Sequence, residues 1–352
     1  VGSSAVTGTG TTWSIDPPAD LAQGVAYAIR IDNKTFANAD GTQRIENTGP
    51  LTRKRMETVD DEFLAAAMDF MDRKHAANEP MFVWCNATRM HFRTHVPESF
   101  RGRSGLNEYA DGMLQHDEWV GKILKKIDDM GIANDTIVIY GTDNGPHYNS
   151  WPDAGTTPFR SEKNTNWEGA YRVPCLVRWP GHIKPGSVSN DIVAHLDWFP
   201  TLAAMAGAPN IKEELKAGTT INGKPYKVYI DGINQLDHIT GKGKSEREGF
   251  LYWTDDGELS GLRVDNWKFV FMEQRMQGTC MIWAEPLTTL RLPKIFNLRT
   301  DPYEFADITS NSYWDWMFDH VYLLVPAQIL VGQVLATFAE FPPRQKAASF
   351  SL

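Results

Sequence analysis

Polar and apolar positions in the first 208 residues predict two long helices and one short helix. Acidic residues followed by an apolar stripe predict a helix over residues 58–77. A longer amphipathic pattern predicts a second helix over 107–130, which ends at Gly131. A third, shorter helix is expected at 198–206. The expected strands lie between these helices along the chain.

Short apolar runs between the helices are typical of buried strands, and they occur at residues 81–84, 136–140 and 173–179. The order strand, long helix, strand predicts a right-handed βαβ unit. The expected fold class is therefore α/β, with a mostly parallel central sheet flanked by helices. The first 50 residues are rich in Gly, Thr, Asp and Asn and predict loops with one short strand at 25–31.

Beyond about residue 208, the pattern of apolar and polar positions changes from alternating helices and buried strands to antiparallel strands. Residues 250–253 and 261–274 alternate as antiparallel strands do, with a hairpin turn expected at 264–267. A helix over 313–341 completes a smaller α+β subdomain. We therefore expect a main domain at 1–208 and a C-terminal subdomain at 209–352.

One stretch near the end raises the question of a membrane. Residues 321–339 carry no charge, and their length approaches that of a spanning helix. Pro326, Gln328, Gly332 and Gln333 interrupt the stretch. We expect a buried or interface helix rather than a membrane span, and an interface would allow a homo-oligomer.

Composition narrows the function classes. The formal net charge of -9 over 352 residues argues against a nucleic-acid partner. The three cysteines lie far apart and predict neither a disulfide framework nor a CxxC metal site. The chain begins at Val1 without a signal segment, which predicts a processed or partial chain.

Polar residues follow the expected strand at 136–140 directly. Asp143 and Asn144 lie in the sequence Thr-Asp-Asn-Gly at residues 142–145. Ligands bind at the carboxyl ends of strands in open parallel sheets. A carboxylate and an amide carbonyl are oxygen donors of the kind that Ca2+ prefers, and Gly145 allows a sharp turn. A simple turn is the alternative reading of this tetrapeptide.

The surrounding motifs resemble a known family. The sequence has KNTNWEGAYRVP at residues 163–174, HLDWFPT at 195–201 and TRMHFRTHVP at 88–97. Together with 142–145 they are similar to the signature regions of the formylglycine-dependent sulfatases of the alkaline phosphatase superfamily. The resemblance covers about residues 57–208 and continues more loosely to the C-terminus.

The resemblance implies roles for five residues. Asp143 and Asn144 match two ligands of a bound Ca2+, and Lys163 matches the lysine that contacts the sulfate. His95 matches the histidine next to the substrate, and His91 is the second candidate. Metal and lysine would neutralise the sulfuryl oxygens, while a histidine supplies the leaving oxygen with a proton.

Three further residues have expected roles. Glu168 and Arg172 are expected to form a structural pair that fixes their loop. Arg160 is expected either to face the anion or to be a solvated loop residue.

The implied function is hydrolysis of a small-molecule or glycan sulfate ester. The alternatives are a phosphonate or phosphodiester hydrolase of the same superfamily, and an inactive remnant or binding module. A periplasmic or secreted location is slightly favoured, although the sequence does not fix it.

The nucleophile of the family has no clear counterpart in this chain. It is a formylglycine made in a Cys/Ser-x-Pro/Ala-x-Arg motif, after a first strand that also delivers an Asp-Asp pair, so we expect it upstream. Cys85 to Arg89 fits the letters of that motif. This match comes after the expected strand at 81–84 and no helix is predicted there, so we interpret Cys85 as a buried structural residue.

Overall fold

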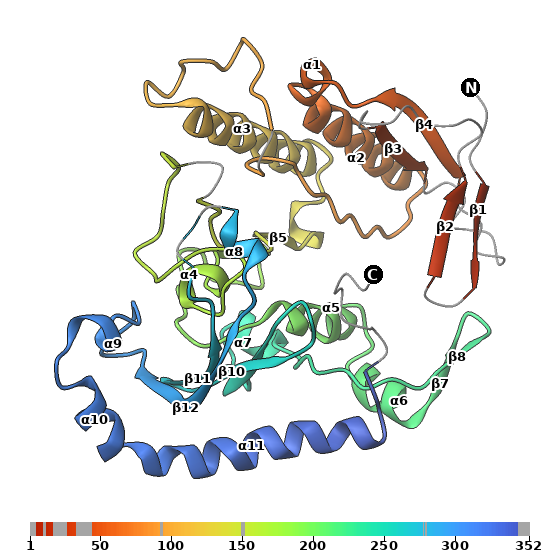
Figure 1. The fold of residues 1–352 in the computed structure, drawn as a ribbon. Coiled ribbons are helices and arrows are strands. Elements are labelled where there is room, and N and C mark those ends of the chain that lie inside the picture. Colours follow the sequence, from red (N-terminus) through yellow and green to blue (C-terminus); the bar gives the residue numbers. More distant parts are fainter. Residues whose placement is uncertain are drawn as a thin grey trace. The chain divides into compact units, whose positions relative to one another are not determined.

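The computed structural model describes residues 5–9, 12–16, 27–32, 44–91, 94–148, 152–276, 278 and 280–343 (Figure 1). The chain divides into two units, Val1–Lys126 and Ile127–Leu352, which are described separately. The expected boundary near residue 208 stays a prediction.

The first unit begins with two antiparallel pairs of strands, β1 with β2 and β3 with β4, whose bounds are Ala5–Thr9, Thr12–Asp16, Tyr27–Asp32 and Arg44–Pro50. The strand expected at 25–31 corresponds to β3, while residues 25 and 26 lie outside the described residues. The other three strands were not predicted, because the first 50 residues are rich in Gly, Thr, Asp and Asn and resemble loops.

The long helices predicted at 58–77 and 107–130 are confirmed. After the short helix α1 (Arg53–Met56), α2 spans Val59–Ala76 and α3 spans Glu108–Asp129. Three acidic residues occupy the first turn of α2 and three basic residues its last turn, which suits the helix dipole at both ends.

Asp60 in the first turn of α2 connects three segments of the first unit. Its carboxylate accepts a hydrogen bond from the Thr88 N–H (2.8 Å) and lies 3.4 Å from the Arg89 guanidinium. Its backbone carbonyl accepts from the indole N–H of Trp119 on α3 (2.9 Å). The buried carboxylate is thus compensated, which its burial requires.

The strand expected at 81–84 is not formed, so that prediction was wrong. These residues adopt no regular secondary structure, and Phe82 and Trp84 are 68% and 80% exposed. A buried strand needs neighbours on its edges and layers on its faces. In the described part of the chain no strand pairs with this segment.

The strands expected at 136–140 and 173–179 are present as β5 (Val138–Gly141) and β6 (Cys175–Arg178), but they pair antiparallel. All strand pairs among the described residues are antiparallel, which corrects the prediction of a mostly parallel sheet. Parallel strands need a long crossover, usually a helix. Among the described residues between β5 and β6, the four-residue α4 (Glu168–Tyr171) is the one helix. Helices and sheets are nevertheless mixed, as the α/β class requires.

The core of the second unit is a four-stranded antiparallel sheet in the order β12-β11-β10-β9, with bounds Thr288–Asn297, Trp267–Glu273, Leu259–Val264 and Gly249–Trp253. The predicted hairpin turn at 264–267 is confirmed, and Asp265 adopts a left-handed φ of 50° in it. Phe269, Val270, Ile295 and Phe296 belong to the buried cluster on this sheet.

Short elements complete the second unit. The helices are η2 (Ala133–Asp135), η3 (His195–Asp197), α5 (Trp198–Met205), α6 (Ile211–Ala217), α7 (Leu236–Ile239), α8 (Met281–Ala284) and α9 (Ala306–Thr309). The strands β7 (Thr219–Ile221) and β8 (Lys224–Tyr226) form a small hairpin. The predicted helix at 198–206 corresponds to α5.

The terminal helix expected at 313–341 is divided into segments: α10 (Tyr313–Asp319), η4 (Val321–Leu323), α11 (Leu324–Ala336) and η5 (Thr337–Ala339). Ala327 of α11 belongs to the buried cluster on the four-stranded sheet. Val321–Ala339, however, is only about 6% buried inside the protein, and its length and apolarity would also suit a membrane span. The expectation of a buried helix therefore does not hold, while an interface helix and the absence of a membrane span stay predictions.

Candidate functional site

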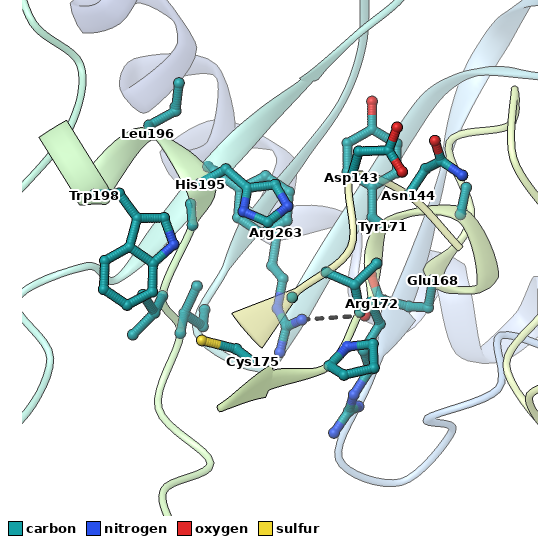
Figure 2. Close-up of a pocket in the computed structure, with 18 of the residues that line it drawn as sticks. Asp143, Asn144, Glu168, Tyr171, Arg172, Cys175, His195, Leu196, Trp198 and Arg263 are labelled. Carbon is teal, nitrogen blue, oxygen red and sulfur yellow. Dashed lines mark hydrogen bonds and ion pairs between the residues drawn. The ribbon is translucent and has the colours of Figure 1, made fainter. Parts of the chain in front are cut away.

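The second unit contains a cleft of about 1730 Å3 at the carboxyl end of β5. Asp143, Asn144, Lys163 and His195 all contribute to its wall. Figure 2 shows Asp143 and Asn144 next to each other at this cleft. The structure thus brings together three of the five residues that the sequence analysis selected.

Two glycines allow the loop after β5 to pack directly on the loop before β6. A Cβ on Gly145 would lie 1.7 Å from the carbonyl oxygen of Gly169, and a Cβ on Gly169 would lie 2.1 Å from that of Ser161. The Gly145 N–H donates to the Ala170 carbonyl at 2.8 Å. Any side chain at either position would separate these backbones.

Lys163 is positioned by its backbone. Its N–H donates to the Pro146 carbonyl (2.9 Å), which connects it to the loop that carries Asp143. Ser161 and Asn164 on either side have left-handed φ values of 64° and 70°. Such conformations are costly for residues other than glycine and are often found at functional sites.

The Lys163 side chain brings positive charge into the cleft. It is partly buried, and it forms no ion pair with any carboxylate in the described part of the chain. Its ammonium lies 5.9 Å from the centroid of the Trp283 ring. An unneutralised cation at a cleft wall favours an anionic ligand.

Asp143 and Asn144 contribute oxygen atoms to the wall of the same cleft. Asp143 is exposed, and its Oδ1 accepts a hydrogen bond from the Thr142 hydroxyl at 3.3 Å. The Asn144 side-chain N–H donates to the Gly145 carbonyl at 2.8 Å, which directs its Nδ2 atom, rather than Oδ1, toward the backbone.

A carboxylate beside an amide oxygen fits part of a site for a hard cation. Ca2+ takes six to eight oxygen ligands, so this pair would supply only some of them. Among the residues that the structure describes, no group of three or more His, Cys, Asp or Glu side chains could hold a metal ion.

A buried cluster of charged residues holds Glu168, the first residue of α4. We call Glu168, Lys268 and Glu304 the lysine cluster; all three side chains are at most 2% exposed. The Lys268 ammonium lies 2.6 Å from Glu304 and 3.4 Å from Glu168. Arg263 donates to Glu168 at 3.2 Å, the dashed line in Figure 2, and the Tyr252 hydroxyl donates to it at 2.8 Å.

The lysine cluster separates the pKa values of its two carboxyls. Burial alone would raise the pKa of Glu168, but Lys268 and Arg263 lower it overall. Burial raises the pKa of Glu304, where only Lys268 provides a compensating charge and Glu168 adds repulsion. Glu168 is therefore the carboxylate that stays ionised most readily.

The arginines have structural roles. Arg160 donates to Asp307 at 2.8 Å, and its guanidinium lies 3.6 Å from the centroid of the Trp167 ring, so it neither faces the anion nor remains solvated. Arg172 lies 4.5 Å over the Phe159 ring. The expected pair of Glu168 with Arg172 is replaced by pairs of Glu168 with Lys268 and Arg263.

His195 was not selected as a site residue, yet it lies in the cleft wall. Its Nε2 lies 3.0 Å from the carbonyl oxygen of Thr142. The helix η3 that carries it is fixed by Asp197, which is fully buried and lies 2.6 Å from the Arg247 guanidinium. The motif at 195–201 was recognised in the sequence, but it gave no indication that the imidazole points to the loop of Asp143.

His91 and His95 belong to the first unit. His91 is exposed, whereas His95 is only partly exposed. Burial, followed by the nearby Arg53, lowers the pKa of His95, although Glu108 and Glu57 act in the opposite direction. The imidazole is therefore mostly neutral at neutral pH.

Cys85 and Arg89 show no sign of a nucleophile motif. Arg89 is buried against Asp60, and its guanidinium also donates to the Glu57 carbonyl at 3.1 Å. Burial and the charge of Asp60 raise the pKa of the Cys85 thiol, which disfavours the reactive thiolate. The raised pKa suits a structural cysteine, but Cys85 is only half-buried and the expected strand before it is absent, so the prediction of a buried residue does not hold.

The cleft thus combines a lysine with oxygen donors, as in proteins that bind anionic esters beside a metal ion. The family model described as Sulfatase matches residues 22–208, more than half of the chain. Arylsulfatase A of Homo sapiens is 31% identical over 258 residues, which cover 70% of this chain and 48% of that protein. N-acetylgalactosamine-6-sulfatase of Mus musculus is 34% identical over 329 residues, 84% of this chain and 60% of that protein.

A solved structure agrees with these sequence matches. The PsFucS1 sulfatase from Pseudoalteromonas sp. superposes with a TM-score of 0.71 at 25% identity, covering 87% of this chain and 58% of that one. The chain belongs to the sulfatase family, within the alkaline phosphatase superfamily. It spans about half the length of the curated relatives it matches.

Proposed function

We propose that this protein hydrolyses sulfate esters and that Lys163 binds the sulfate group. The observation that carries the proposal is the unpaired ammonium of Lys163 in the same cleft as Asp143 and Asn144. A sulfate monoester has a single negative charge spread over three oxygens. A compact ammonium at the wall of a partly apolar cleft suits such a tetrahedral anion.

Sulfatases are generally metal-dependent, and we propose Ca2+ as the ion. Asp143 and Asn144 would hold it with a carboxylate and an amide oxygen. When bound, it would supply positive charge to the sulfuryl oxygens. The backbone hydrogen bonds of Gly145 to Ala170 and of Lys163 to Pro146 would fix the proposed metal-binding and sulfate-binding residues relative to one another.

The leaving oxygen needs a proton as the sulfur–oxygen bond breaks. We propose His95 as the donor, with His91 as the second candidate, and the nucleophile of the family, a formylglycine, as a residue upstream of this chain. Because the pKa of His95 is lowered, its protonated form increases as the solution becomes acidic. Proton donation by His95 therefore favours turnover on the acidic side of neutrality.

The test is release of 4-nitrophenol by the full-length protein from 4-nitrophenyl sulfate, 4-nitrophenyl phosphate and bis(4-nitrophenyl) phosphate. We expect the sulfate to be preferred and Lys163→Ala to lower kcat/KM by about a hundredfold or more. Lys184→Ala, an exposed lysine in the wall of the same cleft, is the matched control and should stay within about twofold.

Two outcomes would contradict the proposal. Full turnover by Lys163→Ala would remove the sulfate-binding role of this residue. Preference for a phosphodiester over the sulfate would assign the site to the phosphonate and phosphodiester hydrolases of the same superfamily.

A further inference from the structure

Trp283 is an exposed aromatic residue beside the proposed sulfate-binding lysine. It lies on α8, is 54% exposed, and its ring centroid is 5.9 Å from the Lys163 ammonium. His147 packs edge-on against the same indole, with ring centroids 5.8 Å apart. Indoles usually gain from burial, so one that remains open at a cleft wall is available to a ligand.

The backbone around Trp283 holds the indole in this position. Ile282, the preceding residue, is only 2% exposed and anchors α8 in the protein. The buried side-chain amide of Gln274 donates to the Ile282 carbonyl at 3.2 Å and to the Glu285 carbonyl at 2.7 Å. The backbone on both sides of Trp283 is therefore held by Gln274, and Trp283 itself lines the cleft.

We infer that Trp283 is the platform on which the ring of the sulfated substrate stacks. The inference rests on the proposed function, because it takes Lys163 as the sulfate-binding residue. A sulfate held by Lys163 places the group on its ester oxygen next to the indole. The substrate class is therefore a sulfate ester of a six-membered ring with an apolar face, either an aryl ring or a pyranose.

A second role for Trp283 is compatible with the same contact. The indole could act only on Lys163, by a cation–π interaction that orients the ammonium. Such an effect would change the binding of every sulfate ester equally. A platform changes only the binding of esters that carry a ring, so a comparison of ligands separates the two roles.

The experiment measures dissociation constants by calorimetry for phenyl sulfate, N-acetylgalactosamine 6-sulfate and methyl sulfate. Trp283→Ala should weaken the binding of a ring-bearing ester about three- to tenfold and leave methyl sulfate within about twofold. Trp283→Phe should restore most of the loss. Trp314→Ala, which removes a 48% exposed tryptophan from α10, is the matched control and should change neither.

The outcomes are separable. A selective loss for phenyl sulfate assigns the platform to aryl esters, and a selective loss for the sugar assigns it to pyranose esters. Equal weakening of methyl sulfate, or no weakening of either ring-bearing ester, overturns the platform. Lys163→Ala should abolish binding of all three ligands; if it does not, the proposed function fails, whatever Trp283 does.

Discussion

The imidazole Nε2 of His195 lies 3.0 Å from the carbonyl oxygen of Thr142. Since a carbonyl oxygen only accepts, Nε2 must carry the proton. The imidazole N–H therefore donates to this backbone carbonyl. It connects η3 to the residue that precedes Asp143 and limits the movement of that loop.

Removing the imidazole should loosen the loop more than it destabilises the fold. For His195→Ala we expect amide hydrogen exchange across residues 142–144 to accelerate about fivefold, with a loss of unfolding free energy below about 1 kcal/mol, because the side chain is exposed. Mass spectrometry of exchanged peptides measures the first effect. His195→Gln retains a side-chain N–H donor and is the matched variant. Unchanged exchange in His195→Ala would show that the hydrogen bond does not restrain the loop.

Gly145→Ala should be strongly destabilising. The added Cβ would lie 1.7 Å from the Gly169 carbonyl oxygen, so the two loops must separate. We expect the free energy of unfolding to fall by about 2 kcal/mol or more in urea titrations. Gly332→Ala on α11 is the control, since its Cβ meets nothing within 4 Å, and it should gain up to about 1 kcal/mol. Equal effects at the two sites would contradict the close contact between the loops.

Asp197 should make stability depend on pH. Burial alone would raise its pKa, but hydrogen bonds from Arg247 and from backbone N–H groups lower it overall. A lowered folded pKa means that the stabilisation is complete above the unfolded value, about 3.9, and is lost as the pH falls through the folded pKa.

The variant that reports this dependence is Asp197→Asn. Breaking the buried pair should cost about 3–5 kcal/mol at pH 7. The difference from the unmodified protein should shrink below about pH 4, as measured by urea unfolding at pH 7, 5 and 3.5. Asp315→Asn, at an exposed position on α10, is the control and should change stability by less than about 0.5 kcal/mol. A difference that stays constant with pH would mean that Asp197 does not titrate in this range.

Removal of Ca2+ tests the two proposed ligands. Calorimetric titration of the chelator-treated protein should show Ca2+ binding that Asp143→Ala weakens at least about tenfold, because it removes the charged ligand. Asp256→Ala removes the same charge from another exposed position in the cleft wall and should stay within about twofold. If both variants lose affinity equally, the ion is attracted by the overall charge of the cleft and not by the Asp143 loop.

Local patterns were sufficient to predict α2, α3, α5 and one hairpin. Helical periodicity and acidic first turns located α2 and α3 to within a residue or two, because both signals lie within the helix itself. The turn at Asp265 also depends on adjacent residues. The segment 81–84 was assigned wrongly because an apolar run does not show whether strands will flank it.

The sequence predicted those residues of the candidate site that lie in recognisable sequence motifs. The loop at 142–145 and Lys163 occur at recognisable spacing, and they share one cleft. His195 and Trp283 were missed because their positions depend on contacts with residues far away in the sequence. Lys268 was missed for a similar reason: a lysine within a strand usually indicates a solvent-exposed position, and here it is fully buried.

The lysine cluster constrains how this sequence can change over time. Lys268 compensates two buried carboxylates at once, so loss of the lysine leaves both without their shared cation, and loss of either carboxylate alters the charge balance of the others. Each single substitution is therefore expected to be worse than a combined replacement by apolar residues of similar volume. The three positions are epistatic, and a lineage can exchange them only together or through a destabilised intermediate.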